Sequence, residues 1–356
     1  MNKIVFFLGG MSRGGGERVL SILANQYAED GWDVSIVQLL SSAVEYPLHP
    51  NIKNIMMCRE NKKRVFNICY WLSNIKKFVK KEKPDIVVSF FCRINILVLL
   101  GIRKKDRKKM RVVLSERNDP RQDGRGKIAS LLANVLYPKA DKIIFQTSDA
   151  KKFFPMKVQK KGVVIANPVK ILANLIDFDK RDKTIINVAR LDKVKNHQLL
   201  IKAFSIVHQQ YPDHQMMIYG EGPERSNLQA LISNLKLDGS IHLPGNVLGV
   251  QQEVAKSSVF VLCSNYEGLS NALMEANALG IPCISTAVFG ANDVIRDGYN
   301  GYVVPIEDVD ALASKLIDVL SDDGKRREMA KNCLEVAETY KYEKTIKQYK
   351  DSIEKD

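Results

Sequence analysis

The chain has 356 residues, of which 45% are hydrophobic and 26% are charged. This length allows two domains of ordinary size, and this composition indicates a soluble globular protein and excludes a disordered one. The formal net charge of +14 is unevenly distributed, because residues 1–168 carry 32 Lys and Arg against 14 Asp and Glu, whereas residues 169–356 carry 22 against 26. The basic character therefore belongs to the first half.

Membrane-spanning and disulfide-linked architectures are disfavoured as well. The longest apolar runs, such as INILVLLGI at 94–102, have about half of the roughly 20 residues that a membrane-spanning helix needs. The N-terminal run KIVFFLG meets a glycine turn and lacks the cleavage site of a secretory signal, so we predict a strand there. The six cysteines are scattered, which argues against a zinc site or a disulfide framework and is typical of a reducing cytosol.

The first half alternates between apolar runs and helical segments. The runs typical of buried strands are KIVFFLG (3–9), DVSIVQLL (33–40), PDIVVSFF (84–91), RVVLSE (111–116), KIIFQTS (142–148) and GVVIAN (162–167). Among the segments between them, residues 16–31 have apolar side chains on one helical face before Gly31 ends the helix. This alternation predicts a parallel sheet with helices on both faces.

The pattern restarts after Asn167 and Pro168, where proline restricts its own backbone and that of its predecessor. Strands are predicted in TIINVAR (184–190), QMMIYGEG (215–222), SIHLPGN (240–246), SVFVLCS (258–264), IPCISTA (281–287) and GYVVP (301–305), with helices at 196–211, 224–235, 270–279 and 308–321. We therefore predict an α/β fold with two Rossmann-like domains, residues 1–168 and 169–339, facing each other across a cleft. Ligands of such sheets bind at the carboxyl ends of the strands.

A glycine-rich turn, GGMSRGGGERVL (9–20), follows the first predicted strand and opens the first helix. Consecutive glycines let a ligand approach the backbone, and a helix N-terminus favours an anion. A dinucleotide fingerprint is disfavoured, because Val19 stands where a third glycine or alanine is expected and the second strand ends at Gln38 without an acid for a ribose. A plain tight turn is the alternative.

Two carboxylates flank a predicted helix N-terminus in SNYEGLSNALMEANALG (264–280). Glu267 lies just before this helix and Glu275 about one turn into it, and Gly280 suits the C-terminal cap. The free N–H groups of the helix attract phosphate, whereas the carboxylates repel it and accept hydrogen bonds from vicinal sugar hydroxyls. A nucleotide diphosphate sugar, with hydroxyls on both sides of its diphosphate, would satisfy the whole segment; a purely structural role for the two acids is the alternative.

At this point the chain resembles glycosyltransferase family 4. The resemblance rests on Glu267 and Glu275 with seven residues between them, on Gly268 and Leu269 after the first acid, and on GIP after the helix. Motifs in the same order as in the family extend over nearly the whole chain: GGGERV, NPV, VARLDKVKNH, YGEGPE, LPGNV and GYNGYVVP. The resemblance implies a retaining enzyme of GT-B architecture, with a C-terminal helix at about 340–356 that returns to the first domain.

The resemblance also implies roles for individual residues. Glu267 would contact hydroxyls of the donor sugar while Arg190 and Lys195 bind its phosphates, and these three form the predicted catalytic set. The predicted donor-binding set is Gly15, Gly16, Asn246, Val247, Gly268, Leu269, Ser270, Asn271 and Glu275. In this set Glu275 would hold the ribose, residues 246 and 247 would meet the base, and the remaining backbone would bind the diphosphate. Taken outside their motif, the two cations would be ordinary solvated loop residues, and Glu221 is predicted to support the base pocket as part of a turn.

These groups need no metal or other cofactor. Departure of the nucleotide diphosphate builds up negative charge, for which Arg190, Lys195 and the helix N-terminus are preorganised donors. Asp177 and Asp179 form a DxD of the type that binds manganese in another transferase fold, but they lie in a charged linker before the first strand of the second domain, so we discount them. The resemblance implies front-face attack, with a donor phosphate oxygen taking the acceptor proton and no side-chain nucleophile.

One position departs from the family. Many members have a histidine beside the donor sugar at the strand end that here reads VVLSERNDP (112–120), and none of the five histidines of this chain clearly replaces it. Glu116 and Arg117 are the candidates for contacts on the acceptor or donor-sugar side.

Two basic segments of the first half suggest an anionic membrane surface as a partner. Residues 59–83 mix nine basic residues with apolar residues at mostly helical spacing, and residues 103–111 add seven cations. A basic amphipathic helix can lie on such a surface, but an ordinary domain helix with its apolar face in the core is an equal alternative for the first segment. Nucleic acid is disfavoured as a partner, because no recognition motif accompanies the cations and the second half is acidic.

The sequence therefore predicts a retaining, metal-independent glycosyltransferase that moves a hexose or N-acetylhexosamine from a nucleotide sugar, with UDP as the favoured nucleotide. The predicted acceptor is a glycan or polyprenyl-linked glycan in surface polysaccharide biosynthesis, at the cytoplasmic face of the plasma membrane. The alternatives are a non-catalytic sugar-nucleotide-binding module, which the presence of Arg190, Lys195 and Glu267 disfavours, and a basic nucleic-acid-binding protein.

Overall fold

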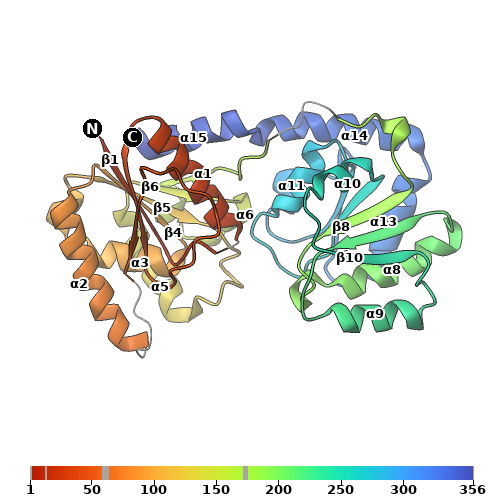
Figure 1. Ribbon diagram of the computed structural model, residues 1–356, viewed down its shortest axis with the longest axis horizontal. Helices are drawn as coiled ribbons and strands as arrows, with labels where there is room; N and C mark the ends of the chain where they lie inside the picture. Colours follow the sequence, from red (N-terminus) through yellow and green to blue (C-terminus); the bar gives the residue numbers. More distant parts are fainter. Residues whose placement is uncertain (1, 13, 58–63, 171–174, 356) are drawn as a thin grey trace. The chain divides into compact units, whose positions relative to one another are not determined.

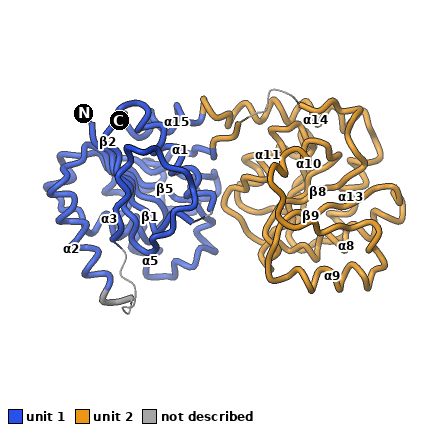
Figure 2. Tube along the Cα trace, viewed as in Figure 1, with its two compact units in different colours: residues 1–167, 345–356 blue, residues 168–344 orange. Residues whose placement is uncertain are grey.

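The computed structural model describes residues 2–12, 14–57, 64–170 and 175–355, and it divides into two compact units (Figures 1 and 2). The first unit contains residues 1–167 and 345–356, and the second contains residues 168–344. The chain thus leaves the first unit between Asn167 and Pro168 and returns to it at Thr345, inside its last helix, α15 (Tyr342–Glu354).

Seven parallel strands form the sheet of the first unit, in the order β3-β2-β1-β4-β5-β6-β7. Their bounds are β1 Lys3–Leu8, β2 Asp33–Gln38, β3 Lys53–Met56, β4 Ile86–Phe90, β5 Arg111–Glu116, β6 Lys142–Phe145 and β7 Gly162–Val164. The central strands are buried on both faces, which explains their continuous apolar runs. The sequence did not predict β3, because this short edge strand is largely exposed and has no buried face to mark it.

The helices of the first unit are α1 Gly15–Glu29, α2 Arg64–Glu82, α3 Cys92–Gly101, α4 Lys104–Arg107, α5 Gly126–Leu136, α6 Ser148–Phe153, α7 Met156–Gln159 and α15. The predicted helix at 16–31 is α1. Helix α3 packs against both α2 and α5, and Figure 1 shows these three helices in one layer beside the sheet.

Six parallel strands form the sheet of the second unit, in the order β10-β9-β8-β11-β12-β13. Their bounds are β8 Thr184–Val188, β9 Gln215–Tyr219, β10 Ile241–Gly245, β11 Val259–Leu262, β12 Cys283–Thr286 and β13 Gly301–Val304. The helices are α8 His197–Gln210, α9 Arg225–Asn234, α10 Gln251–Lys256, α11 Asn271–Ala278, α12 Ala291–Val294, α13 Val309–Leu320 and α14 Asp323–Ala337. The four helices predicted in this half are α8, α9, α11 and α13, each one residue shorter at either end; the charged helix α14 was not predicted.

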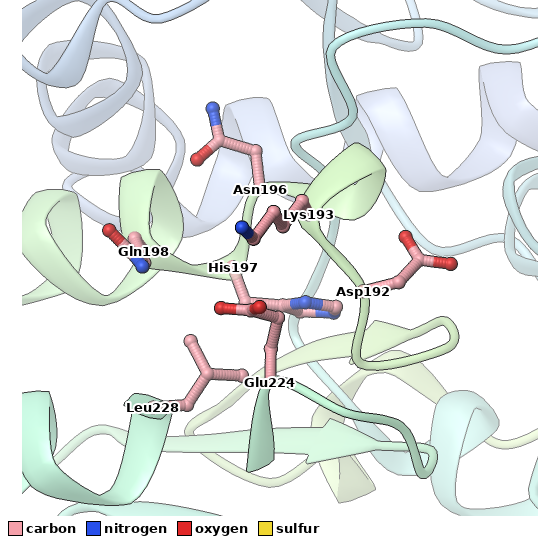
Figure 3. Close-up of a pocket in the computed structure, with 7 residues that line it drawn as sticks. All are labelled: Asp192, Lys193, Asn196, His197, Gln198, Glu224 and Leu228. Atoms are coloured by element: carbon pink, nitrogen blue, oxygen red, sulfur yellow. The ribbon is translucent and has the colours of Figure 1, made fainter. Parts of the chain in front are cut away.

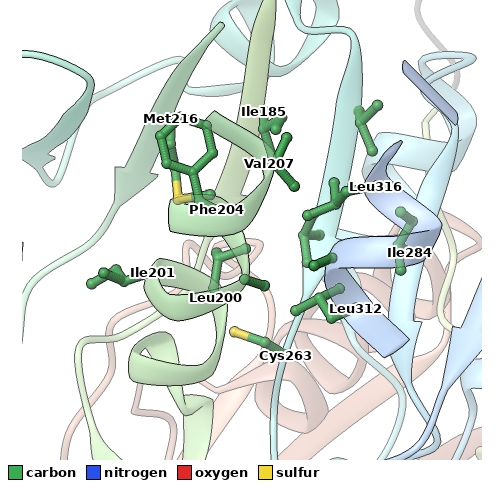
Figure 4. Close-up of a cluster of buried hydrophobic side chains, with 14 of the residues drawn as sticks. Ile185, Leu200, Ile201, Phe204, Val207, Met216, Cys263, Ile284, Leu312 and Leu316 are labelled. Carbon is green, nitrogen blue, oxygen red and sulfur yellow. The ribbon is translucent and has the colours of Figure 1, made fainter. Parts of the chain in front are cut away.

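A buried cluster of apolar side chains holds the second sheet to its helices (Figure 4). Leu200 and Phe204 of α8 and Leu316 of α13 belong to one cluster with Ile185 of β8 and Ile284 of β12, and all five are fully buried. Each such side chain contributes about 1.5–3 kcal/mol relative to an exposed one. This core fixes the strands whose carboxyl ends carry the predicted donor site.

Four of the cysteines, Cys92, Cys263, Cys283 and Cys333, are buried free thiols, as expected for core residues. Cys69 is an exposed free thiol, and Cys58 lies outside the described residues. None of the helices in the described part of the chain is both long enough and apolar enough to cross a bilayer.

Helix α2 corrects one interpretation of the sequence. Its apolar residues Trp71, Ile75 and Val79 are at most 7% exposed, so its apolar face lies in the core of the first unit. Its exposed face carries Lys76, Lys77, Lys80 and Lys81. Of the two readings of segment 59–83, the structure therefore supports the ordinary domain helix; residues 59–63 lie outside the described residues. Segment 103–111 contains the short helix α4, which has no buried residue.

Tyr349 ties α15 to the rest of the first unit. Its hydroxyl accepts a hydrogen bond from Arg117 Nη1 at 2.7 Å and donates to the carbonyl of Ile165 at 3.3 Å, and the ring is fully buried. We predict that Tyr349→Phe lowers the free energy of unfolding of this unit by about 1–3 kcal/mol, because a buried guanidinium and a buried carbonyl lose their partner. Urea unfolding measures the change.

The matched control for that measurement is Tyr299→Phe in the second unit. It removes a hydroxyl that donates to Glu335 at an exposed site, so we expect a change below about 0.5 kcal/mol. Equal changes in the two variants would contradict the role assigned to Tyr349.

Candidate active site

The second unit gathers the predicted catalytic residues at the carboxyl edge of its sheet. The loop after β8 carries Arg190 and Lys195, and the loop after β11 carries Glu267. The strand order reverses between these two strands, because β9 and β10 lie on one side of β8 while β12 and β13 lie beyond β11. Such a switch point is where ligands of parallel α/β sheets bind.

An ion pair joins the two loops at this switch point. Lys195 Nζ contacts Glu267 Oε1, and Ser264 Oγ donates a hydrogen bond to the same oxygen at 2.8 Å. The lysine and glutamate side chains are only 18% and 14% exposed, so water screens this pair less than a surface pair. Sequence reasoning missed Ser264, because a serine at the end of a strand carries no signal of its own.

Local hydrogen bonds fix the loop that carries Lys195. Asp192 Oδ1 accepts hydrogen bonds from the backbone N–H groups of Val194 and Lys195 at 3.1 and 3.2 Å. Asn196 adopts a left-handed conformation with φ of 46°, caps α8 and donates to Asn265 Oδ1 at 2.8 Å. The spacing of Asp192 two residues before Val194 is a turn signal that the sequence contained, since aspartate bonds readily to the backbone two residues on.

Arg190 differs from Lys195 in its exposure. Its side chain is 81% exposed, and its guanidinium pairs with Asp192 Oδ2 at 3.1 Å. An exposed pair of this kind contributes little, so the guanidinium can exchange its aspartate for an anionic ligand at small cost. In this loop, Lys195 is therefore held in place by its ion pair, whereas the Arg190 side chain is free to change its conformation when a ligand binds.

The N-terminus of α11 lies directly after Glu267 in the chain. Gly268 and Leu269 precede the helix, and the Ser270 side chain caps it by accepting a hydrogen bond from the N–H of Leu273. The remaining N–H groups of the first turn have no partner within the helix and carry the positive end of its dipole. Glu275, the fifth residue of α11, is partly exposed.

Side-chain hydrogen bonds fix the opposite end of α11. The hydroxyl of Tyr340 donates to Asn277 Oδ1 at 2.9 Å, and Arg181 Nη1 donates to the carbonyl of Gly280 at 2.8 Å. Gly280 has a φ of +71°, which is the left-handed conformation expected of a C-terminal cap. These contacts at the C-terminal end of α11 therefore also fix the position of its N-terminus.

The predicted base-binding residues follow β10. Asn246 and Val247 are both exposed. Behind them Arg225 donates to the carbonyl of Leu243 at 3.1 Å and pairs with Glu221 at 2.6 Å. Glu221 thus supports the end of β10, which agrees with its predicted place in a turn.

A small cavity lies beside the loop after β8 (Figure 3). Its volume of about 170 Å³ is below the roughly 300 Å³ of typical ligand pockets. The lining residues are Asp192, Lys193, Asn196, His197, Gln198, Glu224 and Leu228. The cavity is therefore too small for a nucleotide sugar.

His197 is a buried neutral imidazole in the wall of this cavity. Its Nε2 lies 3.0 Å from Asn187 Oδ1, and the amide nitrogen of Asn187 donates to the carbonyl of Val261 at 2.7 Å. The asparagine oxygen is therefore the acceptor and Nε2 carries the proton. Burial lowers the pKa of His197 to about 4, since the charged form would lose its hydration.

This lowered pKa gives the second unit a pH-dependent stability. Below the ordinary histidine pKa of 6.5 the unfolded chain binds a proton, while the folded state stays neutral down to about pH 4, so stability is full above pH 6.5 and is lost as the pH falls. We predict a loss of about 3 kcal/mol across this window from His197 alone.

Unfolding by urea at a series of pH values checks this prediction. His197→Gln should lose less stability than the parent between the two pH limits, by the amount assigned to this side chain. His242→Gln, which replaces an exposed histidine of the same unit, should keep the parental dependence. A parental dependence in the His197 variant would show that this imidazole is not the group responsible.

In the glycine-rich turn of the first unit, one of the two predicted ligand-binding glycines is exposed and the other is packed against a neighbouring side chain. Helix α1 begins at Gly15, which is exposed, whereas Gly16 is buried. A Cβ at residue 16 would lie 2.6 Å from the Phe91 ring, so only glycine allows this approach. Of the two glycines predicted to bind the diphosphate, Gly15 exposes its backbone and Gly16 serves the packing; Arg13 lies outside the described residues.

A cavity of about 400 Å³ opens at the carboxyl edge of the first sheet. Its wall includes the Phe91 ring and the polar side chains of Glu17, Arg93, Asn118 and Asp123. Burial raises the pKa of the Glu17 carboxyl, while the nearby Arg117 guanidinium acts in the opposite direction. The cavity has the size and the mixed lining of a small-molecule site.

Glu116 and Arg117 do not line this cavity. They are 1% and 3% exposed. Glu116 pairs with Arg125 at 2.7 Å, and the Arg117 guanidinium lies 5.3 Å from the centre of the Phe90 ring. This burial corrects the expectation that either side chain faces a sugar: Glu116 instead positions Arg125, which does line the cavity together with Asn118.

The two aspartates of the DxD motif at 177–179 both bind other groups of the protein. Asp177 caps the 3₁₀ turn Phe178–Lys180, and Asp179 pairs with Arg327. Over the residues that the structure describes, no group of three or more His, Cys, Asp or Glu side chains is placed to hold a metal ion. Metal independence stays a prediction.

Two sequence profiles match the chain, one over each half. The profile of Glycosyltransferase Family 4 matches residues 13–171, and the profile of Glycosyl transferases group 1 matches residues 172–335. The chain belongs to glycosyltransferase family 4. The two parallel-sheet units of this glycosyltransferase are those of the GT-B fold, as predicted.

Relatives of this glycosyltransferase cover nearly its whole length. The α-1,4-N-acetyl-D-galactosaminyltransferase of Campylobacter jejuni named for GalNAc-α-(1→4)-GalNAc-α-(1→3)-diNAcBac-PP-undecaprenol is 28% identical, over 93% of this chain and 92% of its own. The amylovoran biosynthesis glycosyltransferase AmsD of Erwinia amylovora is 23% identical, over 99% of this chain and all of its own. The crystal structure of Anabaena HepE in complex with UDP has a TM-score of 0.83 at 18% identity, over 99% of each chain. That structural likeness shows the fold alone.

Proposed function

We propose that this family 4 glycosyltransferase moves a hexose or N-acetylhexosamine from a UDP-sugar to a growing glycan, with retention of anomeric configuration and without a metal ion. The observation that carries the proposal is the Lys195–Glu267 pair at the switch point of the second sheet, next to the N-terminus of α11. This arrangement places a cation, backbone donors and a carboxylate in one place, which suits a diphosphate joined to hydroxyl-bearing rings.

The reaction breaks the bond between the anomeric carbon and the diphosphate oxygen. The charge that develops on the departing UDP is stabilised by Lys195, by Arg190 and by the backbone N–H groups that open α11. The acceptor hydroxyl forms the new bond to the anomeric carbon on the same face, and its proton passes to a phosphate oxygen of the donor. No side chain forms a covalent intermediate in this scheme.

The carboxylates orient the donor around its diphosphate. Glu267 accepts hydrogen bonds from hydroxyls of the transferred sugar while it holds Lys195, and Glu275 binds the ribose. Asn246 and Val247, at the exposed end of β10, meet the uracil base. The adaptable guanidinium of Arg190 closes on the phosphates when its weak pair with aspartate opens.

The acceptor in this proposal is a glycan on a polyprenyl diphosphate or a growing surface polysaccharide. Two relatives are named for such products, one for an undecaprenol-linked glycan and one for amylovoran. The cavity of about 400 Å³ in the first unit, with its apolar ring and hydrogen-bonding side chains, suits the acceptor sugar. We place the enzyme in the cytoplasm, at the inner face of the plasma membrane, where a lipid-linked acceptor and a soluble nucleotide sugar can meet.

Ligand-dependent stability tests the donor site. We predict that UDP, and not GDP, ADP or NAD, raises the melting temperature, since a ligand at 100 times its dissociation constant stabilises by about 2.7 kcal/mol. Glu275→Ala should lose this effect, and Glu328→Ala, which removes an exposed helical glutamate of the same unit, should keep it. If no nucleotide stabilises the parent, a donor site of this kind is absent and the nucleic-acid-binding alternative moves ahead.

Steady-state kinetics test the role of the cation. We predict that Lys195→Met lowers kcat by about 10²–10³-fold with a smaller change in KM, because the lysine acts on charge that develops in the transition state. The assay follows UDP release from UDP-hexoses and UDP-N-acetylhexosamines in the presence of extracted polyprenyl-linked glycans.

Lys193→Ala is the control for the cation, since it removes an exposed lysine two residues away in the same loop. It should keep parental kinetics. UDP binding without any transfer by the parent would instead support a sugar-nucleotide-binding module.

A further inference from the structure

Helix α5 has an apolar face that the protein leaves uncovered. Ile128, Leu131, Leu132 and Val135 follow the helical spacing i, i+3, i+4, i+7 and are 79%, 65%, 37% and 58% exposed. Soluble proteins scatter single exposed apolar side chains over their surfaces, but a continuous stripe of four large ones marks an interaction surface.

The other side of α5 faces the first unit. Ala133 and Leu136 are its buried residues, and the helix packs on α3 and on the 3₁₀ turn Tyr137–Lys139 that follows it. Figure 1 shows α5 in the same helical layer as α3 and α2. The exposed stripe therefore lies on the side of α5 opposite its contacts with the first unit.

Two further exposed apolar side chains lie near the C-terminal end of α5. Phe153 and Met156 are 39% and 63% exposed. They lie near the end of α5, because Tyr137 stacks on Phe154 at 5.5 Å and Phe153 meets the same ring edge-on at 5.3 Å. Helix α7, which begins at Met156, also packs on the 3₁₀ turn after α5. We call the four side chains of α5 together with Phe153 and Met156 the α5 surface.

The surroundings of the α5 surface are strongly basic. Residues 121–161 contain ten Lys and Arg against three Asp and Glu. The exposed cations of this stretch are Arg121, Lys127, Lys139, Lys152, Lys157 and Lys160. A second copy of the chain would bring the same cations against one another, which disfavours a dimer through this face. An anionic bilayer has the opposite charge and accepts apolar side chains below its headgroups.

We propose that the α5 surface is the membrane anchor of this protein and docks the first unit on an anionic bilayer. The apolar side chains enter the boundary between headgroups and acyl chains, and the surrounding lysines bind anionic headgroups. This assigns the membrane contact to a helix that lies outside segments 59–83 and 103–111. The docking step does not depend on the proposed function.

The membrane anchor also suggests how a lipid-linked acceptor reaches the enzyme, and this second step rests on the proposed function. Asp123 and Arg125 line the cavity of the first unit, and α5 begins at the next residue, Gly126. Docking through α5 therefore brings that cavity to the bilayer surface. A polyprenyl-linked acceptor would reach the cavity without leaving the membrane.

Vesicle flotation with the full chain tests the anchor. The protein should float with phosphatidylcholine vesicles that contain phosphatidylglycerol and not with phosphatidylcholine alone, and binding should weaken at high salt. The triple variant Ile128→Gln, Leu131→Gln, Val135→Gln should lower the partition coefficient about tenfold or more, because binding strength follows the apolar area that enters the bilayer. The matched control is Leu235→Gln with Ile306→Gln, two exposed apolar residues of the second unit that are 38% and 41% exposed; it should float like the parent.

A fluorescence measurement separates insertion from simple attraction of charges. In Leu131→Trp, anionic vesicles should shift the emission to shorter wavelength, and lipids brominated in the acyl chain should quench it. Binding without quenching would show that only headgroups are contacted and would overturn the anchor. Flotation of the triple variant equal to that of the parent would overturn it as well.

Two further readouts keep the proposals distinguishable. Sedimentation velocity without lipid should find a monomer; a parental dimer that the triple variant abolishes would make the α5 surface a protein interface and overturn the anchor. UDP-dependent stabilisation should be equal in the parent and the triple variant. A parent that floats with anionic vesicles but is not stabilised by UDP would retain the anchor and refute the proposed donor.

Discussion

The ion pair between Lys195 and Glu267 is the contact on which the site of the second unit depends. It joins the loops after β8 and β11 at the point where the strand order reverses, and it does so with side chains that are largely withdrawn from water. Low exposure keeps the attraction strong, while the remaining exposure leaves both groups within reach of a ligand. Asn265 joins the same two loops through hydrogen bonds with Asn196 and with the carbonyl of Val194, so the ion pair is the charged part of a larger set of contacts between them.

The rest of the second unit supports that pair from several directions. Asp192 and Asn196 shape the loop that presents the lysine, and Ser264 holds the carboxylate oxygen. Tyr340 and Arg181 hold the far end of α11, so that its N-terminus stays beside the carboxylate. The first six strands of the first unit have the same order as the strands of the second unit. In the first unit, however, the carboxyl edge of the sheet carries a cavity, and helix α5 exposes an apolar face.

Both sheets could be predicted, because parallel strands buried on two faces give apolar runs that stand out from their surroundings, as in β1 and β4. Strand β3 lacks a buried face and α14 is rich in charge, so neither gave a comparable signal. The motifs of the sequence pointed to the two loops that form the site of the second unit. The part played by Ser264 became visible only from its hydrogen bond to Glu267 in the folded structure. Glu116 was predicted to face a sugar, but it pairs with the buried Arg125 guanidinium. The sequence shows only a carboxylate at the end of a strand and does not show whether that carboxylate faces a cavity or a buried cation.

The sequence by itself determined the alternation of strands and helices, the boundary near Pro168, the cap at Gly280 and the basic first half, because each of these is a local property of the chain. Only the tertiary structure decided which amphipathic helix is open to a partner. Helices α2 and α5 both carry an apolar face; that of α2 is packed in the core, and that of α5 is exposed. Periodicity identifies an apolar face, but what covers that face depends on residues far away in the sequence.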